Sequence, residues 1–341
     1  MKITKLFHNV LIVRTDRIGD VVLTTPAIKS LRHTYPTARI SILVGPSTRD
    51  LVDGNPYLDE VLVDERQGRH QGLLGFLRLA LQLRSRHFDL AVIFHTKRRY
   101  NLACCLAGIP CRLGYKNDKY GFLLTHPLKD TRHLGEKHEA QYCKDVLRPL
   151  GIEDDEMGVF VPLQPEAEAW ALGTMRENSL VSNEFIVVHP GASDPAKRWP
   201  AADFARVMES LIQRHPFKIV LIGAPQTAPV AAEILRLVPQ ASQCLNLTGH
   251  TTVAQMASLL RRSRLLISND SGPVHVAAGV GTSVISIFMR DDPGINVKRW
   301  KPLGARSHVL NNKFHPGAVK AEDVLKLVEQ IFRKNSQYEI F

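Results

Sequence analysis

Apolar residues along this chain follow two patterns that alternate with each other. Short, nearly continuous apolar runs predict buried strands, and between them apolar residues recur every three or four positions, as on one face of a helix. In the first half, one helix is predicted between Pro26 and Pro36, and a longer one, rich in leucine and arginine, at Leu73–Leu83. The strands predicted there are Val10–Arg14, Ile40–Val44, Glu60–Val63 and Leu90–Phe94. The remainder of the first half shows no regular pattern.

A second alternating series starts at Phe185. Its predicted strands are Phe185–His189, Lys218–Ile222, Leu265–Ser268 and Ser283–Phe288. Its predicted helices are Ala201–His215, Pro229–Val238, Val253–Arg261 and the amphipathic Ala321–Arg333. Alternating strands and helices are typical of parallel α/β sheets, so we expect two doubly wound, Rossmann-like domains. Ligands of open α/β sheets bind beyond the carboxyl ends of the strands, which places the expected active site in a cleft between two facing domains.

Two prolines mark the boundary between the series. Pro162 and Pro165 precede a polar stretch with helical spacing, and a chain of 341 residues is too long for one ordinary core. We therefore predict four segments. They are an N-terminal domain at 1–162, a linker at 163–182, a C-terminal domain at 183–320, and a final helix and tail at 321–341 that could pack back toward the N-terminal domain.

Composition excludes several classes of protein. Hydrophobic residues make up 44% of the chain and charged residues 23%, which argues against disorder. No apolar run approaches the roughly 20 residues that cross a bilayer, and Met1–His8 leads into a strand without a signal-type segment. The five cysteines include no pair at metal-site spacing and are expected to be reduced. We therefore expect a cytoplasmic protein.

Basic residues outnumber acidic residues by 44 to 33, which gives a net charge of +11. This favours an acidic partner, whether nucleic acid, an anionic membrane surface or a phosphorylated substrate, and charge alone does not choose among them. The basic run Lys97, Arg98 and Arg99 follows a predicted strand and could bind acidic groups of an acceptor substrate. A run of charges can equally be a solvated face.

The loop of residues 269–272 carries the clearest signal for a ligand. It follows a predicted strand and runs into a proline, which is favoured at the start of a helix. The N-terminus of a helix presents backbone N–H groups and the positive end of the helix dipole, so a phosphate can bind there. Asp270 and His275 bracket this position. A structural interpretation is open as well, in which Ser271 only caps the helix, Gly272 only forms the turn and His275 only packs.

Two further loops, residues 14–20 and 189–200, also follow predicted strands. Asp20, in the first loop, is a candidate general base that would accept the proton of an attacking sugar hydroxyl. Its structural interpretation is a carboxylate stabilised by the dipole at the start of a helix. Lys197, in the second loop, could place positive charge on a departing phosphate, or it could be an ordinary solvated lysine.

Other signals are weaker. Gly279 begins a stretch that starts like a dinucleotide fingerprint, but this stretch lacks the third glycine and follows a helix, which excludes NAD binding there. The polar residues His133, His138 and Glu139 lie in a loop or at a helix start. Capping or solvation explains them better than metal binding.

Three motifs together resemble the lipopolysaccharide heptosyltransferases of glycosyltransferase family 9. Residues Arg17–Ile28, RIGDVVLTTPAI, are similar to the opening of this family, especially of its type III members. PAKRWP at 195–200, and NDSG at 269–272 followed by HVAA at 275–278, are more similar to type II. The resemblance extends over nearly the whole chain. It implies the two-domain GT-B fold and an inverting reaction that needs no metal ion or other cofactor.

The resemblance also implies roles for individual residues. Asp20 matches the catalytic base of the family, and Lys197 matches the lysine that contacts the donor phosphates. The implied donor-binding residues are Gly191, Ser193, Lys197, Thr227, Asp270, Ser271, Gly272 and His275. The candidate acceptor-binding residues are Gly19, Lys97, Arg98 and Arg99.

Two loops depart from the family pattern. The loop of residues 223–227 has Thr227 where some members carry an acidic residue for the donor ribose. Residues 289–293 read MRDDP where the family commonly has GPTDP. The second departure places charged side chains near the expected donor site and could alter donor selection.

The activity implied by the resemblance is transfer of heptose from ADP-L-glycero-D-manno-heptose to a lipopolysaccharide inner core that carries lipid A and Kdo. The positive charge would draw the protein to the anionic cytoplasmic face of the inner membrane as a peripheral protein, and no nucleic-acid partner is expected. One alternative is a GT-B glycosyltransferase with another nucleotide sugar. The alternative from another class is a non-catalytic binder of nucleic acid or an anionic surface.

Overall fold

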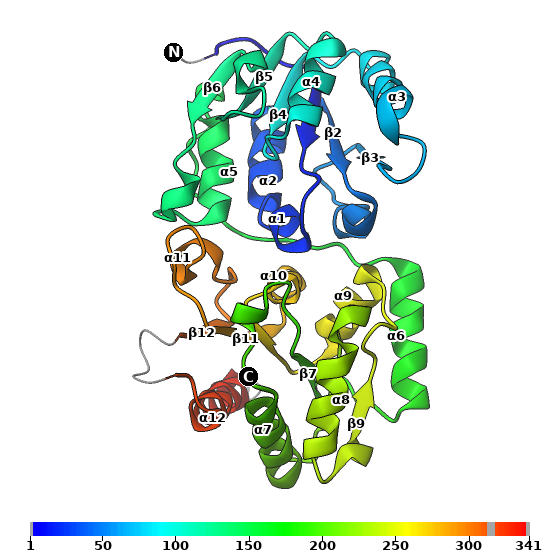
Figure 1. Cartoon of the computed structure of the whole chain (residues 1–341), viewed down its shortest axis with the longest axis vertical. Helices are drawn as coiled ribbons and strands as arrows, with labels where there is room; N and C mark the ends of the chain where they lie inside the picture. The colour runs from blue at the N-terminus through cyan, green and yellow to red at the C-terminus, as the bar shows by residue number, and fades with distance from the viewer. Residues whose placement is uncertain (1–2, 312–317, 339–341) are drawn as a thin grey trace. The chain divides into compact units, whose positions relative to one another are not determined.

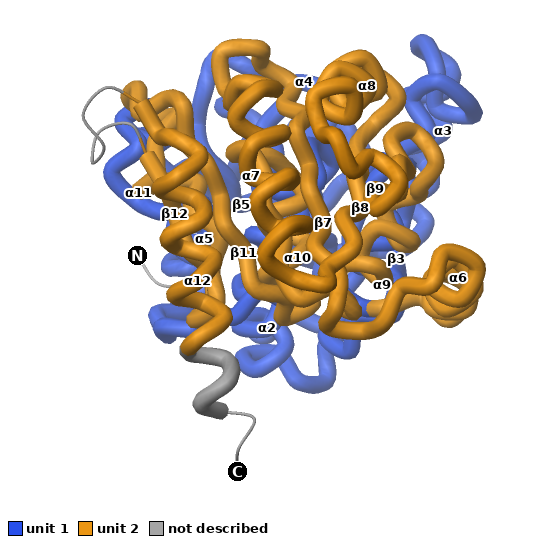
Figure 2. Tube along the Cα trace, turned by 90° about the horizontal axis from the view of Figure 1, so that it is seen from below, with its two compact units in different colours: residues 1–162 blue, residues 163–341 orange. Residues whose placement is uncertain are grey.

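Each half of the chain is built around one six-stranded sheet (Figure 1). In this computed structural model, which describes residues 3–311 and 318–338, the chain divides into units of residues 1–162 and 163–341 (Figure 2). The sheet orders are β3-β2-β1-β4-β5-β6 and β12-β11-β10-β7-β8-β9. Numbered within its own unit, each sheet has the order 3-2-1-4-5-6, which is that of the Rossmann fold.

The first unit holds a fully parallel sheet. Its strands are β1 (Asn9–Val13), β2 (Arg39–Val44), β3 (Glu60–Val63), β4 (Leu90–Ile93), β5 (Cys111–Lys116) and β6 (His126–Lys129). Its α-helices are α1 (Ile18–Val22), α2 (Thr25–Thr34), α3 (Gly72–Arg84), α4 (Arg98–Leu106) and α5 (Glu139–Leu147). The apolar runs at β1 and β4 are buried on both faces of the sheet, as in other parallel sheets covered by helices.

The second unit repeats this arrangement with its own core. Its strands are β7 (Phe185–His189), β8 (Lys218–Leu221), β9 (Cys244–Asn246), β10 (Leu265–Asn269), β11 (Ser283–Phe288) and β12 (Ser307–Asn311). Its α-helices are α6 (Pro165–Glu177), α7 (Ala201–Arg214), α8 (Ala228–Leu237), α9 (Val253–Arg262), α10 (Gly272–Gly279), α11 (Val297–Trp300) and α12 (Ala321–Tyr338). A single apolar cluster joins the sheet to helices α7, α8 and α12.

Both segments expected to lie outside the two domains contain a helix. The predicted linker, 163–182, contains α6, which packs on α9 and is tied to it by an ion pair of 2.6 Å between Glu168 and Arg262. Helix α12 packs against α7, and its residues Val324, Val328 and Ile331 are buried in the core of the second unit. The contact of this helix with the N-terminal domain stays a prediction. Residues 339–341 of the predicted tail lie outside the described residues.

The register of the sheets brings specific loops together. Val13 pairs with Ile93 across β1 and β4, so residues 14 and 94 leave the first sheet side by side. In the second sheet, Ser268 of β10 pairs with His189 of β7. Each pair marks the point where the strand order reverses, and this crevice at the carboxyl ends of the strands is where open α/β sheets bind ligands. None of the described helices combines the length and apolar composition needed to span a membrane.

Candidate active site

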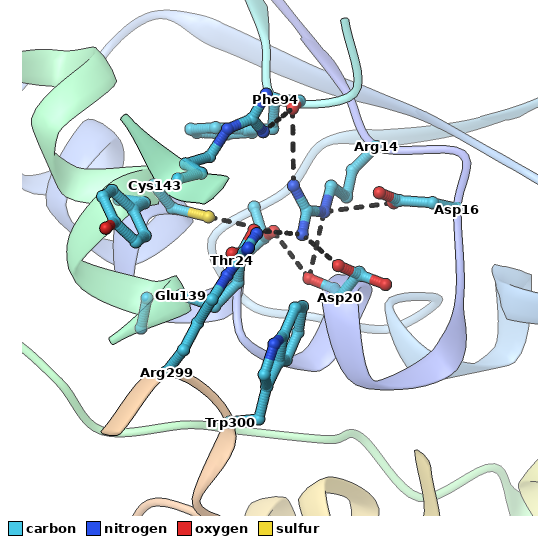
Figure 3. Close-up of polar contacts among 12 residues, drawn as sticks. Arg14, Asp16, Asp20, Thr24, Phe94, Glu139, Cys143, Arg299 and Trp300 are labelled. Atoms are coloured by element: carbon cyan, nitrogen blue, oxygen red, sulfur yellow. Dashed lines mark hydrogen bonds and ion pairs between the residues drawn. The ribbon is translucent and has the colours of Figure 1, made fainter. Parts of the chain in front are cut away.

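The candidate site of the first unit is organised by Arg14, the residue that follows β1. Its guanidinium is almost fully buried, and Nη2 donates to Oδ1 of Asp20 at 2.8 Å and to Oε1 of Glu139 at 3.0 Å (Figure 3). Nε lies 3.1 Å from Oδ1 of Asp16. Nη1 reaches the carbonyl oxygen of Phe94 at 3.5 Å. One buried cation therefore holds three carboxylates at the switch point of the sheet.

Asp20 lies in the short helix α1 and is only 15% exposed. The backbone is fixed by two contacts to its carbonyl oxygen, from Nε of Arg14 at 3.1 Å and from the hydroxyl of Thr24 at 2.8 Å. The carboxylate accepts from Arg14 through Oδ1, and Oδ2 accepts no hydrogen bond from the residues that the structure describes. Gly19, the predicted acceptor-binding neighbour, is buried in the same helix. Asp20 thus has one anchored oxygen and one that is available to a proton.

The electrostatics of this cluster suit proton transfer. Burial raises the pKa of Asp20 to about 7, and the negative charges of Asp16 and Glu139 add to the increase while Arg14 opposes it. Burial alone would lower the pKa of Arg14, but the surrounding acidic groups hold it well above its usual value, so the guanidinium stays charged. A carboxylate with a pKa near neutrality is matched to general base catalysis.

The structure contradicts the role that the sequence predicted for Glu139. Its position at the start of α5 suggested capping or solvation, but its side chain is buried and paired with Arg14. Capping is instead the role of His138, whose ring nitrogen accepts from the amide of Ala140 at 3.2 Å. His133 is exposed. The prediction was right for the two histidines and wrong for Glu139, because residues 125 positions apart meet only through the fold of the sheet.

His95 also lies at this edge of the sheet, two residues after the end of β4. Its Nδ1 is 2.9 Å from the hydroxyl of Thr15. Burial, with Lys97 and Arg14 nearby, lowers the pKa of His95 to about 3. The imidazole is therefore neutral, and the loops that follow β1 and β4 are joined by a neutral hydrogen bond beside the charged cluster.

The three basic residues at the start of α4 have different surroundings in the structure. Lys97 and Arg98 are exposed at the start of the helix, whereas Arg99 donates to both oxygens of Asp64 at 2.9 Å. Burial raises the pKa of Asp64, but hydrogen bonds from Arg99 and Tyr100 outweigh it and hold the pKa below its usual value. Arg99 is thus engaged by a permanent carboxylate, and acceptor binding by the three basic residues stays a prediction.

In the second unit, polar side chains meet where β7 and β10 end. Nδ1 of His189 is 3.1 Å from the hydroxyls of both Ser268 and Ser271. Burial lowers the pKa of His189 to about 4, so the ring is neutral. Ser271 occupies the N-cap position of α10, but its side chain does not cap the helix. The interpretation of Ser271 as only a cap is therefore wrong, and its hydroxyl instead links the helix start to His189.

Lys197 and Asp270 form the charged pair of this unit, with Nζ 2.5 Å from Oδ2. Burial raises the pKa of Asp270, although Lys197 acts in the opposite direction. Lys197 is partly exposed in the 3-10 turn η5 (Pro195–Lys197), and Asp270 is buried directly after β10. The pair places an ammonium group next to the start of α10, where the helix dipole is also positive.

The loop that carries Lys197 is held in place by hydrogen bonds to Asn269 and by a buried tryptophan. The backbone N–H of Trp199 donates to the side-chain oxygen of Asn269 at 2.9 Å, and the amide of Asn269 donates to the carbonyl of Pro190 at 2.7 Å. The indole of Trp199 is buried edge-on against Phe204, with ring centroids 4.9 Å apart. Trp199 therefore packs this loop onto the core of the second unit. It holds Lys197 close to Asp270.

Glycine lets the loop after β7 approach Thr227. A Cβ atom added to Gly191 would lie 2.5 Å from Oγ1 of Thr227, closer than any real contact allows. Thr227 is buried, whereas Ser193 is exposed in the same loop as Gly191. Gly272 begins α10, and His275 is buried one turn further along. The predicted donor residues therefore all lie in the loops and the helix start at one edge of the second sheet.

The loop of residues 289–293, which departs from the family pattern, is linked by an ion pair to the loop of Lys197. Arg290 lies 2.7 Å from Oδ2 of Asp194 and 2.6 Å from Oδ2 of Asp292. Asp194 also accepts from the backbone of Ala196 within the turn. The sequence indicated charged residues here but not their partner. Within residues 3–311 and 318–338, no group of three or more His, Cys, Asp or Glu side chains is arranged to hold a metal ion.

The chain is similar to known proteins over most of its length. The profile of glycosyltransferase family 9 (heptosyltransferase) matches residues 76–328. Lipopolysaccharide heptosyltransferase 3 of Escherichia coli K12 is 26% identical over 345 aligned residues, covering 93% of this chain and 96% of that protein.

Solved structures are similar in fold. A glycosyl transferase family 9 structure from Veillonella parvula DSM 2008 has a TM-score of 0.88 at 22% identity, covering 98% of this chain and 100% of that chain. The E. coli heptosyltransferase WaaC, solved with ADP, has a TM-score of 0.74 at 16% identity, covering 95% and 99%. These similarities confirm the predicted GT-B class with two Rossmann-like units.

Proposed function

This chain belongs to glycosyltransferase family 9, the heptosyltransferases, and from that premise we propose that it transfers heptose from ADP-L-glycero-D-manno-heptose to the inner core of lipopolysaccharide. Family membership confirms the expected enzyme class over that of a non-catalytic binder. Among the proteins named above, the E. coli K12 relative is a lipopolysaccharide heptosyltransferase and WaaC was solved with ADP. The donor, the stereochemistry and the residue roles given below are parts of this proposal.

The second unit would hold the donor. A diphosphate placed at the start of α10 would meet backbone N–H groups, the positive end of the helix dipole and the ammonium of Lys197. Asp270 keeps that ammonium oriented before the donor arrives. Gly191 lets the loop after β7 lie against Thr227, and Thr227 offers a hydroxyl instead of the carboxylate of some relatives.

The observation that carries the proposal is the state of Asp20. A carboxylate with a pKa of about 7 can take up a proton from a sugar hydroxyl and release it again near neutral pH. Arg14 holds Oδ1, which leaves Oδ2 for the acceptor hydroxyl. The structural interpretation, a carboxylate stabilised only by the helix dipole, does not account for burial beside two further acidic groups.

The proposed reaction is a single displacement. The acceptor oxygen forms a bond to the anomeric carbon of heptose as its proton moves to Asp20. The bond between that carbon and the β-phosphate oxygen breaks, and its electron pair stays on ADP. Attack opposite the leaving group inverts the anomeric centre. Lys197 and the start of α10 stabilise the charge that develops on the diphosphate, so the scheme uses no metal ion.

Substitution of Asp20 by asparagine tests this assignment. We expect Asp20→Asn to bind ADP as the wild type does and to lose transfer by about 10²–10⁴-fold, because the positioned base is gone. Product mass spectrometry with ADP-, UDP- and GDP-sugars would identify the donor, and EDTA should leave transfer intact. Full activity of the variant would remove Asp20 from the mechanism, and reaction with a non-heptose donor alone would overturn the donor assignment.

A further inference from the structure

Helix α3 presents an apolar face to solvent. Leu73, Leu74, Leu77 and Leu81 are 73%, 81%, 42% and 66% exposed. Leu73, Leu77 and Leu81 follow one another at intervals of four, so they form one stripe along the helix, and Leu74 lies beside it. Figures 1 and 2 both show α3 at the periphery of the first unit. Exposed leucines are ordinary when single, but four on one helix face require an explanation.

The opposite face of the same helix packs against the core of the first unit. Leu79 and Leu83 are buried in the core of the first unit, and Phe76 packs against that core under the guanidinium of Arg99. A Cβ atom on Gly75 would lie 2.3 Å from the backbone of His70, so the helix sits directly on the preceding loop. Because α3 is fixed in this way, its outer leucines cannot turn inward. A helix with apolar side chains on both its inner and its outer face is normally covered on both.

The charge around the stripe indicates what covers it. Residues 66–88 contain five arginines and no acidic residue. Arg78 and Arg84 are exposed on α3 next to the leucines. Arg69 is half-exposed in the loop before the helix and is paired with Glu65 at 3.3 Å. Leucines flanked by arginines match a bilayer interface, where the apolar side chains enter the acyl boundary and the guanidinium groups meet lipid phosphates.

We propose that α3 is the surface by which this protein docks on an anionic lipid bilayer. A second copy of the chain fits less well, because a two-fold interface would place the same arginine-rich patch against itself. Docking rests on the proposed function in one respect, because the lipid-linked acceptor of that function lies in such a bilayer. Docking through α3 would hold the enzyme where that acceptor is presented.

Vesicle sedimentation tests the proposal without involving catalysis. The full-length protein should bind vesicles of phosphatidylethanolamine with phosphatidylglycerol, and bind vesicles of phosphatidylcholine alone much less. We expect Leu74→Gln/Leu81→Gln to lower the partition coefficient by at least about tenfold, and Arg84→Gln to lower it about fivefold. The matched controls are Leu172→Gln/Leu237→Gln, exposed leucines of α6 and α8, and Arg236→Gln in the last turn of α8.

Two results would overturn the proposal. One is wild-type vesicle binding by the leucine variant. The other is a change from dimer to monomer in that variant by sedimentation equilibrium, which would make the face a contact between copies. Transfer to a water-soluble, delipidated acceptor separates this failure from failure of the proposed function, because the α3 variants should keep that activity while Asp20→Asn loses it.

Discussion

Arg14 is paired with each of the acidic side chains that surround it. Its guanidinium is shared among Asp16, Asp20 and Glu139, so no single carboxylate is fully neutralised. This sharing explains why burial can raise the pKa of Asp20 to about 7 although a cation is 2.8 Å away. An isolated buried pair of arginine and aspartate would lower the aspartate pKa instead. The competing anions thus help to keep the pKa of Asp20 near neutrality.

Glu139 is therefore predicted to be a positioning residue that tunes Asp20 without touching substrate. Glu139→Gln removes a negative charge and gives Asp20 a larger share of Arg14, and both changes lower the pKa of Asp20. We expect the acidic limb of the pH profile of kcat/KM to move down by about 1 pH unit. Glu136→Gln, an exposed neighbour, is the control. A variant that lost activity with an unshifted limb would show a merely structural role.

The raised pKa of Asp20 also predicts how stability depends on pH. Because the pKa is near 7 in the folded chain and about 3.9 when unfolded, the folded state binds the extra proton, and this stabilisation declines as pH rises from about 4 to 7. Asp20→Asn should match the wild type near pH 4 and have a Tm higher by about 2–6 °C at pH 8. Thermal unfolding at the two pH values measures this. A lower Tm at pH 8 would mean that the ion pair with Arg14 outweighs burial.

At the scale of elements, the sequence predicts strands and helices well where one apolar pattern is continuous. The runs that became β1, β4, β7 and β10 are buried throughout, so their pattern is unmistakable. Strand β6 was missed because it lies at the edge of the sheet, contains a proline and alternates in exposure over four residues. Helices α4 and α5 were missed with it, and so was the buried ion pair that α5 contributes.

The two loops at the edge of the second sheet act as one element through Lys197 and Asp270. We expect Lys197→Gln to reduce turnover by about 10²–10³-fold and to weaken ADP binding, because it removes the charge that would stabilise the leaving diphosphate. Lys326→Gln, an exposed lysine on α12, should change neither quantity. Steady-state kinetics with ADP inhibition would measure both. Unchanged turnover in Lys197→Gln would leave this lysine with a structural role only, as the ion-pair partner of Asp270.

At the scale of the whole molecule, the proposed function places the two substrates on different units, each built on a repeat of the Rossmann sheet. Each unit has its own core and its own reversal of strand order. The sequence predicted this duplication because strand-like and helix-like segments alternate in both halves of the chain. It did not predict that the first unit would concentrate buried carboxylates around one arginine while the second would pair a lysine with a helix start, since both arrangements depend on contacts between distant segments.

This division predicts where ADP protects the chain from hydrogen exchange. A ligand stabilises the part of a protein that binds it and slows the local opening of that part. We expect ADP to slow exchange in the loops at 190–200 and 223–227 and at the start of α10, and to leave residues 14–20 nearly unchanged. Lys197→Gln should weaken this protection, whereas Asp20→Asn should preserve it. Equal protection of residues 14–20 by ADP alone would contradict the assignment, because the nucleotide would then be held by both units, and Asp20 would be a donor contact before it could act as a base toward the acceptor.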